Sequence, residues 1–211
     1  MAHVKSFVFN DFSENTYIVY DETNECIIID PGCCNSSEEK ELSQFISDNN
    51  LNPTHLINTH CHIDHILGNN YIHHLYQLPL EAHKNEKIVL ESGTQIAMMY
   101  GISYSESPPI SVFLQEGKTV EFGNTILDII ETPGHSPASI SLYSRKDGFV
   151  ISGDVLFQGS IGRTDLPGGN FDILISMITQ KLFTMPAETK VYSGHGPVTT
   201  IGQEMRTNPF F

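Results

Sequence analysis

Four of the six residues at positions 60–65 are histidine or aspartate, whose side chains can bind a metal ion. The segment reads His-Cys-His-Ile-Asp-His and follows an apolar run that predicts a β-strand. In an extended chain, His60, His62 and Asp64 would share one face, because successive side chains alternate across a strand. His65 breaks that alternation and can point elsewhere. One short segment could therefore serve two metal ions, which suggests a hydrolase built around a metal-bound water.

Three later segments repeat one local pattern, in which an apolar strand runs into a short turn of small residues. These turns deliver His135, Asp154 and His195. Loops at the carboxyl ends of strands often carry functional side chains, and glycine in such loops lets the backbone crowd around a compact centre. We therefore expect these three side chains to act together with the segment at 60–65.

The combined set holds five imidazoles and two carboxylates, which is more than one ion needs. Its members are His60, His62, Asp64, His65, His135, Asp154 and His195. Two divalent ions with one bridging carboxylate would use them all, and such a pair lowers the pKa of a bridging water towards ~7. Nitrogen and oxygen donors suit Zn²⁺, which is the metal that we expect. They also suit Fe or Mn.

The remaining histidines and the cysteines have simpler interpretations. We interpret the other five histidines as structural: His3, His55, His73, His74 and His83. The cysteines contain no CxxC spacing and are expected to be free thiols in a reducing cytosol: Cys26, Cys33, Cys34 and Cys61. Strand alternation turns Cys61 away from its neighbours' face, so we do not expect it to be a ligand.

Bulk composition limits the partners of this chain. The 211 residues suffice for one substantial domain, and 39% hydrophobic content is adequate for a core. The net charge of −14 disfavours nucleic acid and anionic membranes, because binding to phosphates needs a basic patch. No apolar run is long enough to span a bilayer and no signal peptide is apparent. We expect a cytoplasmic protein with a small-molecule substrate.

Hydrophobic patterning predicts an α/β domain of two similar halves, each a mostly antiparallel sheet with helices on one face. Strands are expected at 4–9, 15–20, 26–29, the run ending at 59, 78–81, 119–122, 125–131, 139–143, 149–152 and 190–192. One helix is expected to begin with a capping box of Ser36 and Glu39. Further helices are expected at 66–76 and 84–100, and after a cap at Asp172.

Five short motifs, in this order, resemble those of the metallo-β-lactamase superfamily. They are Asp30-Pro31-Gly32, the segment 59–65, Thr132-Pro133-Gly134-His135-Ser136, Ser152-Gly153-Asp154 and Ser193-Gly194-His195-Gly196. The resemblance covers nearly the whole chain. It implies a four-layer αβ/βα sandwich that forms a single hydrolase domain over residues 1–211.

The resemblance also implies a role for each candidate ligand. His60, His62 and His135 would bind one ion, and the other ion would be bound by Asp64, His65 and His195. Asp154 would bridge the two ions, and Asp30 would orient a ligand imidazole. Asp64 and Asp154 are the expected catalytic carboxylates, acting with a metal-bound hydroxide. The resemblance thus separates Asp64 from the ion of His60 and His62.

Within the superfamily the chain is most similar to the short glyoxalase II-like thioesterases. The segments that carry this similarity are 157–169, 201–204 and 206–210. Such proteins resemble hydroxyacylglutathione hydrolases, which cleave S-lactoylglutathione. Arg163 falls where the family places a cation for the glutathione part of the substrate, or it pairs with a nearby carboxylate. Asp165 stands where an aromatic residue is expected, and the chain is too short for the C-terminal helical domain that grips glutathione.

Other functions of the same fold remain open at this point. A persulfide dioxygenase would use one iron and also shares the segments 59–62 and 162–165, whereas the tail at 208–210 favours the thioesterase. A β-lactamase is disfavoured because such enzymes commonly carry Cys where Asp154 stands or lack the Asp64 pattern. The net charge disfavours a tRNA-processing nuclease. The intact ligand set argues against a non-catalytic binding protein, and the oligomeric state is not predicted.

Overall fold

Two six-stranded β-sheets organise the chain in the computed structural model, which describes residues 1–211. The chain divides into two compact units, which are described separately below. The first unit comprises Met1–Phe113 with Glu121–Thr125, and the second comprises Leu114–Val120 with Ile126–Phe211. The expectation of one hydrolase domain over residues 1–211 stays a prediction.

The first sheet has the strand order β1-β2-β3-β4-β5-β6. Its strands are β1 (His3–Phe9), β2 (Glu14–Tyr20), β3 (Glu25–Ile29), β4 (Asn52–Ile57), β5 (Leu80–His83) and β6 (Ile110–Leu114). The first three strands pair antiparallel, but β3 pairs parallel with β4, and β4 with β5. The predicted antiparallel pairing is thus present from β1 to β3, whereas β3, β4 and β5 are parallel, because the helices between these strands return the chain in the same direction.

Helices connect the strands of the first sheet from β3 to β6. They are α1 (Ser36–Asp48), α2 (Ile63–Ile66), α3 (Asn69–Tyr76), a 3₁₀ turn (Lys84–Glu86), α4 (Lys87–Glu91) and α5 (Gly93–Tyr100). The predicted capping box is wrong, because Asn35 is the N-cap of α1 and its side chain accepts from the amides of Ser37 and Glu38. Ser36 already lies inside the helix.

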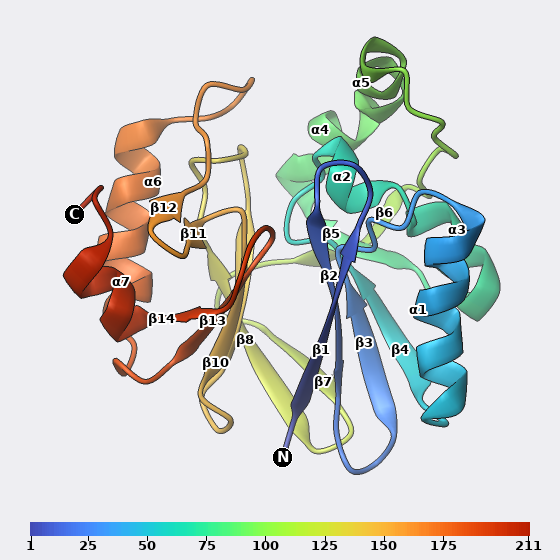
Figure 1. Cartoon of the computed structure of the whole chain (residues 1–211), viewed down its shortest axis with the longest axis horizontal. Coiled ribbons are helices and arrows are strands. Elements are labelled where there is room, and N and C mark those ends of the chain that lie inside the picture. Colours follow the sequence, from blue (N-terminus) through green and yellow to red (C-terminus); the bar gives the residue numbers. More distant parts are fainter. The chain divides into compact units, whose positions relative to one another are not determined.

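The core of the first unit is formed between its helices and its parallel strands. Leu42 and Ile46 of α1 and Ile72 of α3 belong to one buried cluster with Ile28 of β3 and Leu56 of β4. Figure 1 shows α1 and α3 running beside these strands. The apolar stripe predicted for the first helix is therefore confirmed at Leu42 and Ile46.

The second sheet has the strand order β14-β13-β10-β9-β8-β7. Its strands are β7 (Thr119–Phe122), β8 (Thr125–Glu131), β9 (Ile140–Ser144), β10 (Phe149–Gly153), β13 (Lys190–Ser193) and β14 (Thr199–Thr200). Antiparallel pairs join β8 to β9, β9 to β10 and β13 to β14, whereas β10 and β13 are parallel. A separate hairpin pairs β11 (Leu156–Phe157) with β12 (Ser160–Ile161).

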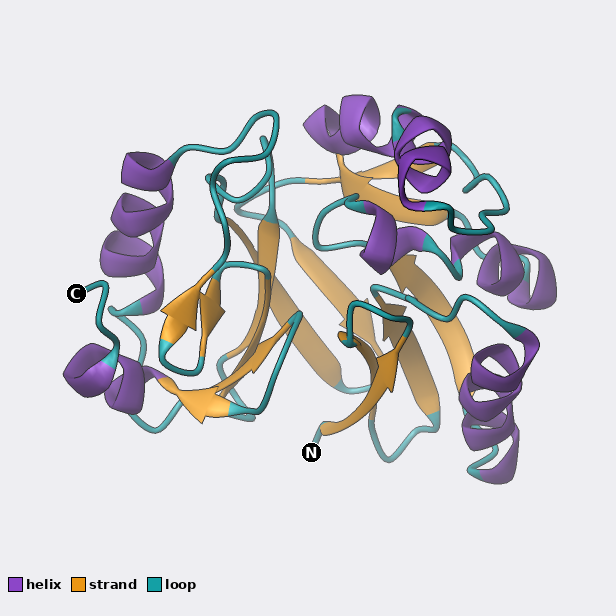
Figure 2. Ribbon diagram, turned by 45° about the horizontal axis from the view of Figure 1, so that its top comes forward, coloured by secondary structure: helices purple, strands orange, loops and turns teal.

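Two helical segments complete the second unit, and Figure 2 shows them in purple near the C-terminus. The first is α6 (Phe171–Met177), which continues as a π-helical turn (Ile178–Leu182), and the second is α7 (Ile201–Thr207). Asn170, not Asp172, is the N-cap of α6, because its side chain accepts from the amide of Ile173. Asp172 lies in the first helical turn, where a negative charge is favourable.

The core of the second unit lies between α6 and the sheet. Leu174, Ile178 and Leu182 are fully buried in one cluster with Val150 of β10 and Val191 of β13. The apolar stripe predicted for this helix is therefore confirmed.

The C-terminal residues pack on the same chain. The ring of Phe211 lies 4.7 Å from that of Phe183, and the ring of Phe210 lies 6.4 Å from that of Phe171. Separately, none of the helices is both long enough and apolar enough to span a lipid bilayer.

Candidate metal centre

The segment at 60–65 is a loop followed by a short helix, not a continuation of the strand. Strand β4 ends at Ile57, His62 is the N-cap of α2, and Asp64 lies inside that helix. The predicted alternation of His60, His62 and Asp64 is therefore wrong, because strand geometry does not persist beyond Ile57. The ring of His60 lies 4.8 Å from that of His62 and 4.2 Å from that of His65. The turn into α2 thus gathers three imidazoles.

Asp30 anchors the loop between β4 and α2 through hydrogen bonds to Thr59. Its Oδ1 accepts from the Thr59 amide at 2.7 Å and its Oδ2 from the Thr59 hydroxyl at 2.6 Å. The same Oδ2 lies 3.2 Å from Nδ1 of His65. Asp30, His60 and His65 are all buried and offer ligand-type atoms that lie within 4.8 Å of one another. Asp30 is therefore placed to orient the imidazole of His65.

Two buried glutamates next to this loop were missed by the sequence-based reasoning. Glu14 of β2 has Oε1 3.8 Å from Nδ1 of His65, and burial raises the pKa of Glu14 well above its usual value. Oε2 of Glu86 accepts a hydrogen bond from the backbone amide of Cys61 at 2.9 Å. Both acids come from segments distant in sequence and lie in no recognisable motif, so no local signal identified them.

Cys61 belongs to the hydrophobic core rather than to the group of imidazoles. It is 1% exposed within the buried cluster of the first unit, and burial raises the pKa of its thiol well above the usual value. A thiol that stays protonated is a poor metal ligand. The geometry therefore agrees with the expectation that Cys61 is not a ligand.

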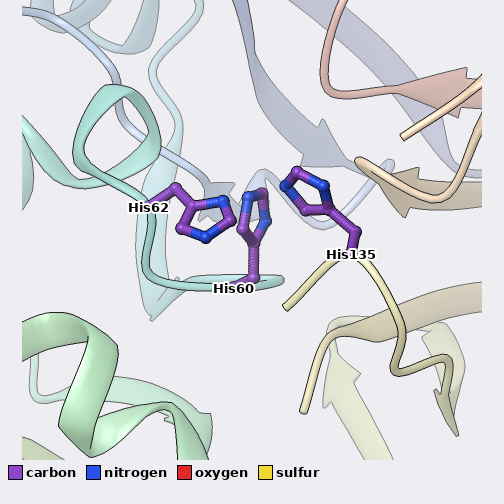
Figure 3. A group of neighbouring side chains, drawn as sticks. All are labelled: His60, His62 and His135. Carbon is purple, nitrogen blue, oxygen red and sulfur yellow. The ribbon is translucent and has the colours of Figure 1, made fainter. Parts of the chain in front are cut away.

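The second unit gathers the other three candidate ligands around one carboxylate oxygen. Oδ2 of Asp154 lies 3.5 Å from Nε2 of His135 and 3.5 Å from Nε2 of His195. Nδ1 of His135 lies 2.7 Å from the carbonyl oxygen of Arg163. A carbonyl only accepts, so Nδ1 carries the proton and Nε2 is left to act as a ligand. Figure 3 shows His135 in the loop that follows β8, and His60 and His62 in the loop that follows β4.

Gly162 allows the backbone to pack closely behind these ligands. A Cβ built at Gly162 would lie 1.9 Å from the carbonyl oxygen of Asp154 and 3.2 Å from Cβ of His135. Any larger residue would therefore displace the backbone of Asp154. The close packing explains why a glycine precedes Arg163 in this segment.

Arg163 pairs with the carboxylate two residues further along the chain. Its Nε and Nη2 each donate to one oxygen of Asp165 at 2.7 Å, and both side chains are mostly exposed. Hydrogen bonds from Arg163 lower the pKa of Asp165 to about 2. Of the two interpretations of Arg163 that the sequence left open, the salt bridge is thus present in the structure.

Each unit therefore assembles part of the predicted ligand set from residues that converge locally. The first unit gathers His60, His62, Asp64 and His65, with Oδ2 of Asp64 3.6 Å from Nε2 of His65. The second unit gathers the rest around Asp154. All the donors are imidazole nitrogens and carboxylate oxygens, which suits divalent Zn, Fe or Mn. These histidine and aspartate groups fit a metal-binding role.

A family-wide sequence comparison matches residues 9–195 to the family described as the metallo-beta-lactamase superfamily. Among curated relatives, the chain is 39% identical over 198 residues to the probable metallo-hydrolase YqgX of Bacillus subtilis, covering 93% of this chain and 91% of the relative. It is 34% identical over 206 residues to the hydroxyacylglutathione hydrolase GloC of Haemophilus influenzae, covering 94% and 93% of the two chains.

Solved structures resemble the chain over nearly its full length. The BLEG-1 B3 metallo-beta-lactamase has a TM-score of 0.91 at 36% identity and covers 99% of both chains. TTHA1623 in a di-iron-bound form has a TM-score of 0.88 at 33% identity and covers 99% of this chain and 100% of its own. ETHE1 from Myxococcus xanthus has a TM-score of 0.80 at 29% identity, covering 98% and 83%.

Proposed function

The chain belongs to the metallo-β-lactamase superfamily, and from this premise we propose that it is a two-metal hydrolase of 2-hydroxyacyl-glutathione thioesters such as S-lactoylglutathione. One observation carries the two-metal part of this proposal. A single carboxylate oxygen of Asp154 stands 3.5 Å from the ligand nitrogens of both His135 and His195. A carboxylate flanked by two imidazoles in this way is suited to bridge two ions.

The proposed ligand assignment follows the sequence motifs. His60, His62 and His135 hold one ion, the other is held by Asp64, His65 and His195, and Asp154 bridges them. Divalent ions held by such a set lower the pKa of a coordinated water and polarise a carbonyl oxygen. We expect Zn²⁺ first, with Fe or Mn as alternatives, because these donors do not select strongly among them.

The side chains around the ligands keep them in position. Asp30 accepts from Thr59 and faces Nδ1 of His65, so it fixes both the loop and the ring. The Arg163 carbonyl fixes the tautomer of His135. Such outer partners commonly change metal affinity or activity 10–100-fold when they are removed. Asp30 and the Arg163 carbonyl therefore act as positioning groups in the proposed enzyme.

The thioester part of the proposal is supported by the name of the relative GloC and by Arg163. Hydrolysis adds water across the C–S bond: a C–O bond forms, the C–S bond breaks, and the thiolate takes a proton. The guanidinium of Arg163 is suited to an anionic group on the glutathione part. We further propose a cytoplasmic enzyme whose partners are small molecules, without nucleic acid or membrane.

The experiment that tests this function combines elemental analysis with a hydrolysis assay on one sample. We expect two divalent ions per chain and hydrolysis of S-lactoylglutathione. Asp154→Ala should lose metal and at least about a hundredfold in activity together, because the bridging ligand is removed. Asp172→Ala is the matched control, since Asp172 is an exposed carboxylate in the same unit.

Three outcomes would contradict the proposal. Undiminished hydrolysis by a metal-depleted Asp154→Ala protein would rule out the metal-dependent reaction. Full activity of His135→Ala at wild-type metal content would contradict the role of His135. One iron per chain, with oxygen uptake on glutathione persulfide, would favour the persulfide dioxygenase instead.

β-Lactam hydrolysis is a second candidate, favoured by the similarity to the BLEG-1 B3 metallo-beta-lactamase. The same metal-loaded sample should be assayed with penicillin, cephalosporin and carbapenem substrates. If any of these is hydrolysed with a higher kcat/KM than S-lactoylglutathione, the second candidate replaces the first.

A further inference from the structure

We propose that Asp165 competes with the anionic group of the substrate for Arg163 and thereby sets the affinity of the enzyme for that group. This inference rests on the proposed function, because it concerns the substrate of the same site. Asp165 would then be a specificity-determining residue that neither binds metal nor touches the reacting atoms.

The geometry of the pair resembles the contact that a substrate carboxylate would make. Nε and Nη2 of Arg163 donate to the two oxygens of Asp165, each at 2.7 Å. This two-point arrangement is the one that arginine offers to any carboxylate. An incoming carboxylate therefore has to replace Asp165 before it can use the same donors.

The exchange is feasible because the pair is exposed. The side chains of Arg163 and Asp165 are 58% and 68% exposed. Ion pairs of this kind contribute little stability and are screened by salt. Asp165 thus reduces the affinity for an anionic ligand by a modest factor and does not block the site.

The backbone that carries Arg163 is held by contacts that do not involve Asp165. The Arg163 carbonyl accepts from Nδ1 of His135, and Gly162 packs against the carbonyl of Asp154. The guanidinium therefore starts from a fixed point beside two proposed metal ligands. Removal of the Asp165 charge should make these two donors available to an incoming carboxylate without moving the backbone of Arg163.

The overall charge strengthens the argument for competition. The chain carries 25 acidic and 11 basic residues, so cations that could hold an anionic substrate are scarce. A carboxylate placed two residues from the candidate cation adds to the repulsion that such a substrate meets.

The test is Asp165→Asn in the metal-loaded protein, assayed with S-lactoylglutathione. We expect KM to fall roughly two- to fivefold, within the range for an exposed ion pair, with kcat nearly unchanged. The difference from wild type should shrink as salt is raised. Glu188→Gln removes an exposed carboxylate elsewhere in the same unit and should leave KM unchanged.

A double variant identifies the partner through which Asp165 acts. In an Arg163→Ala background, Asp165→Asn should have no further effect on KM, because the cation for which the two anions compete is gone. An equal fall in KM without Arg163 would show that Asp165 acts by general repulsion and would overturn the proposal. An unchanged or raised KM in the single variant would overturn it as well.

Glutathione binding to the same metal-loaded proteins, measured by calorimetry, tests this inference independently of the proposed function. If the wild type hydrolyses no thioester, the proposed function fails. The affinity for glutathione still tests whether Asp165 competes for Arg163. We expect Asp165→Asn to bind glutathione roughly two- to fivefold more tightly than wild type. Equal or weaker binding, or no binding to any variant, would overturn the competition.

Discussion

Carboxylates contact two histidines of the first unit, His65 and His55, and they act on them in different ways. Asp30 and Glu14 both face Nδ1 of His65, at 3.2 Å and 3.8 Å, inside the protein. Outside the cluster around His65, a carboxylate oxygen of Glu81 in β5 lies 2.6 Å from Nδ1 of His55 in β4. This second pair is structural, as we expected for His55, and it makes the stability of the unit depend on pH.

The hydrogen bond from His55 to Glu81 raises the pKa of His55 above its usual value. A raised pKa in the folded state stabilises the fold fully below the unfolded pKa of about 6.5. The stabilisation is lost as the pH rises through the folded pKa. His55→Gln should therefore cost about 2 kcal/mol at about pH 6 and much less at about pH 9, by urea unfolding.

The control for His55 is His74→Gln, which removes an exposed imidazole from α3 of the same unit. Its unfolding free energy should differ little from wild type at either pH. A loss for His55→Gln that is equal at both pH values would contradict the ion pair with Glu81.

The hairpin of β11 and β12 is the element that connects the C-terminal segment to the candidate ligands. The carboxylate of Glu204 in α7 is buried and accepts from the Gly159 amide at 2.8 Å and from Nδ2 of Asn208 at 2.9 Å. The ring of Phe157 in β11 lies 6.1 Å from that of His195. The C-terminal segment therefore holds the hairpin against His195, and the chain after β12 packs behind Asp154 through Gly162.

Gly162→Ala should disturb the ligands more than it disturbs the fold around them. The new Cβ would lie 1.9 Å from the Asp154 carbonyl, so the segment must shift and overpacking should cost about 1–3 kcal/mol. We expect this shift to lower both the metal content and the activity of the purified variant, as measured by elemental analysis and by assay.

Gly159→Ala, in the turn of the β11–β12 hairpin, is the matched control for Gly162→Ala. A Cβ there meets no atom within 4 Å, although φ is +67°. Its cost is backbone strain alone, about 1–2 kcal/mol, and metal content should be kept. If both variants retain metal equally, Gly162 is not needed for the geometry of Asp154.

At the scale of the whole molecule, each of the two units supplies ligand-type side chains from segments that follow its strands, which in the first unit include the short helix α2. The net charge of −14 favours cation binding in general. Because the unfolded chain does not hold these groups together, bound metal should stabilise the folded protein.

Removal of metal by a chelator should therefore lower Tm, as followed by calorimetry. At a free metal concentration a thousand times Kd, the stabilisation is about 4 kcal/mol per ion. Asp154→Ala should show a much smaller difference between chelated and metal-supplemented samples. A wild-type Tm that is insensitive to chelation and resupply would contradict metal binding by these residues.

Local patterns in the sequence were sufficient to predict most strands and the candidate ligands. The strands at 119–122 and 125–131 have the predicted bounds, because strong alternation is a local property. The N-caps predicted at Ser36 and Asp172 were wrong by one and two residues, since the side chains of Asn35 and Asn170 take that role. Short elements such as β11, β12 and β14 have too few residues to show a pattern.

By itself the sequence determined which donor atoms are available and that they follow apolar strands, because residue type and short spacing are local properties. Only the tertiary structure decided what surrounds those donors. It ended strand β4 at Ile57 and so placed Asp64 in a helix, it brought Glu14 to His65, and it paired Arg163 with Asp165. These arrangements depend on chain packing and on choices among several possible partners, which residue spacing does not encode.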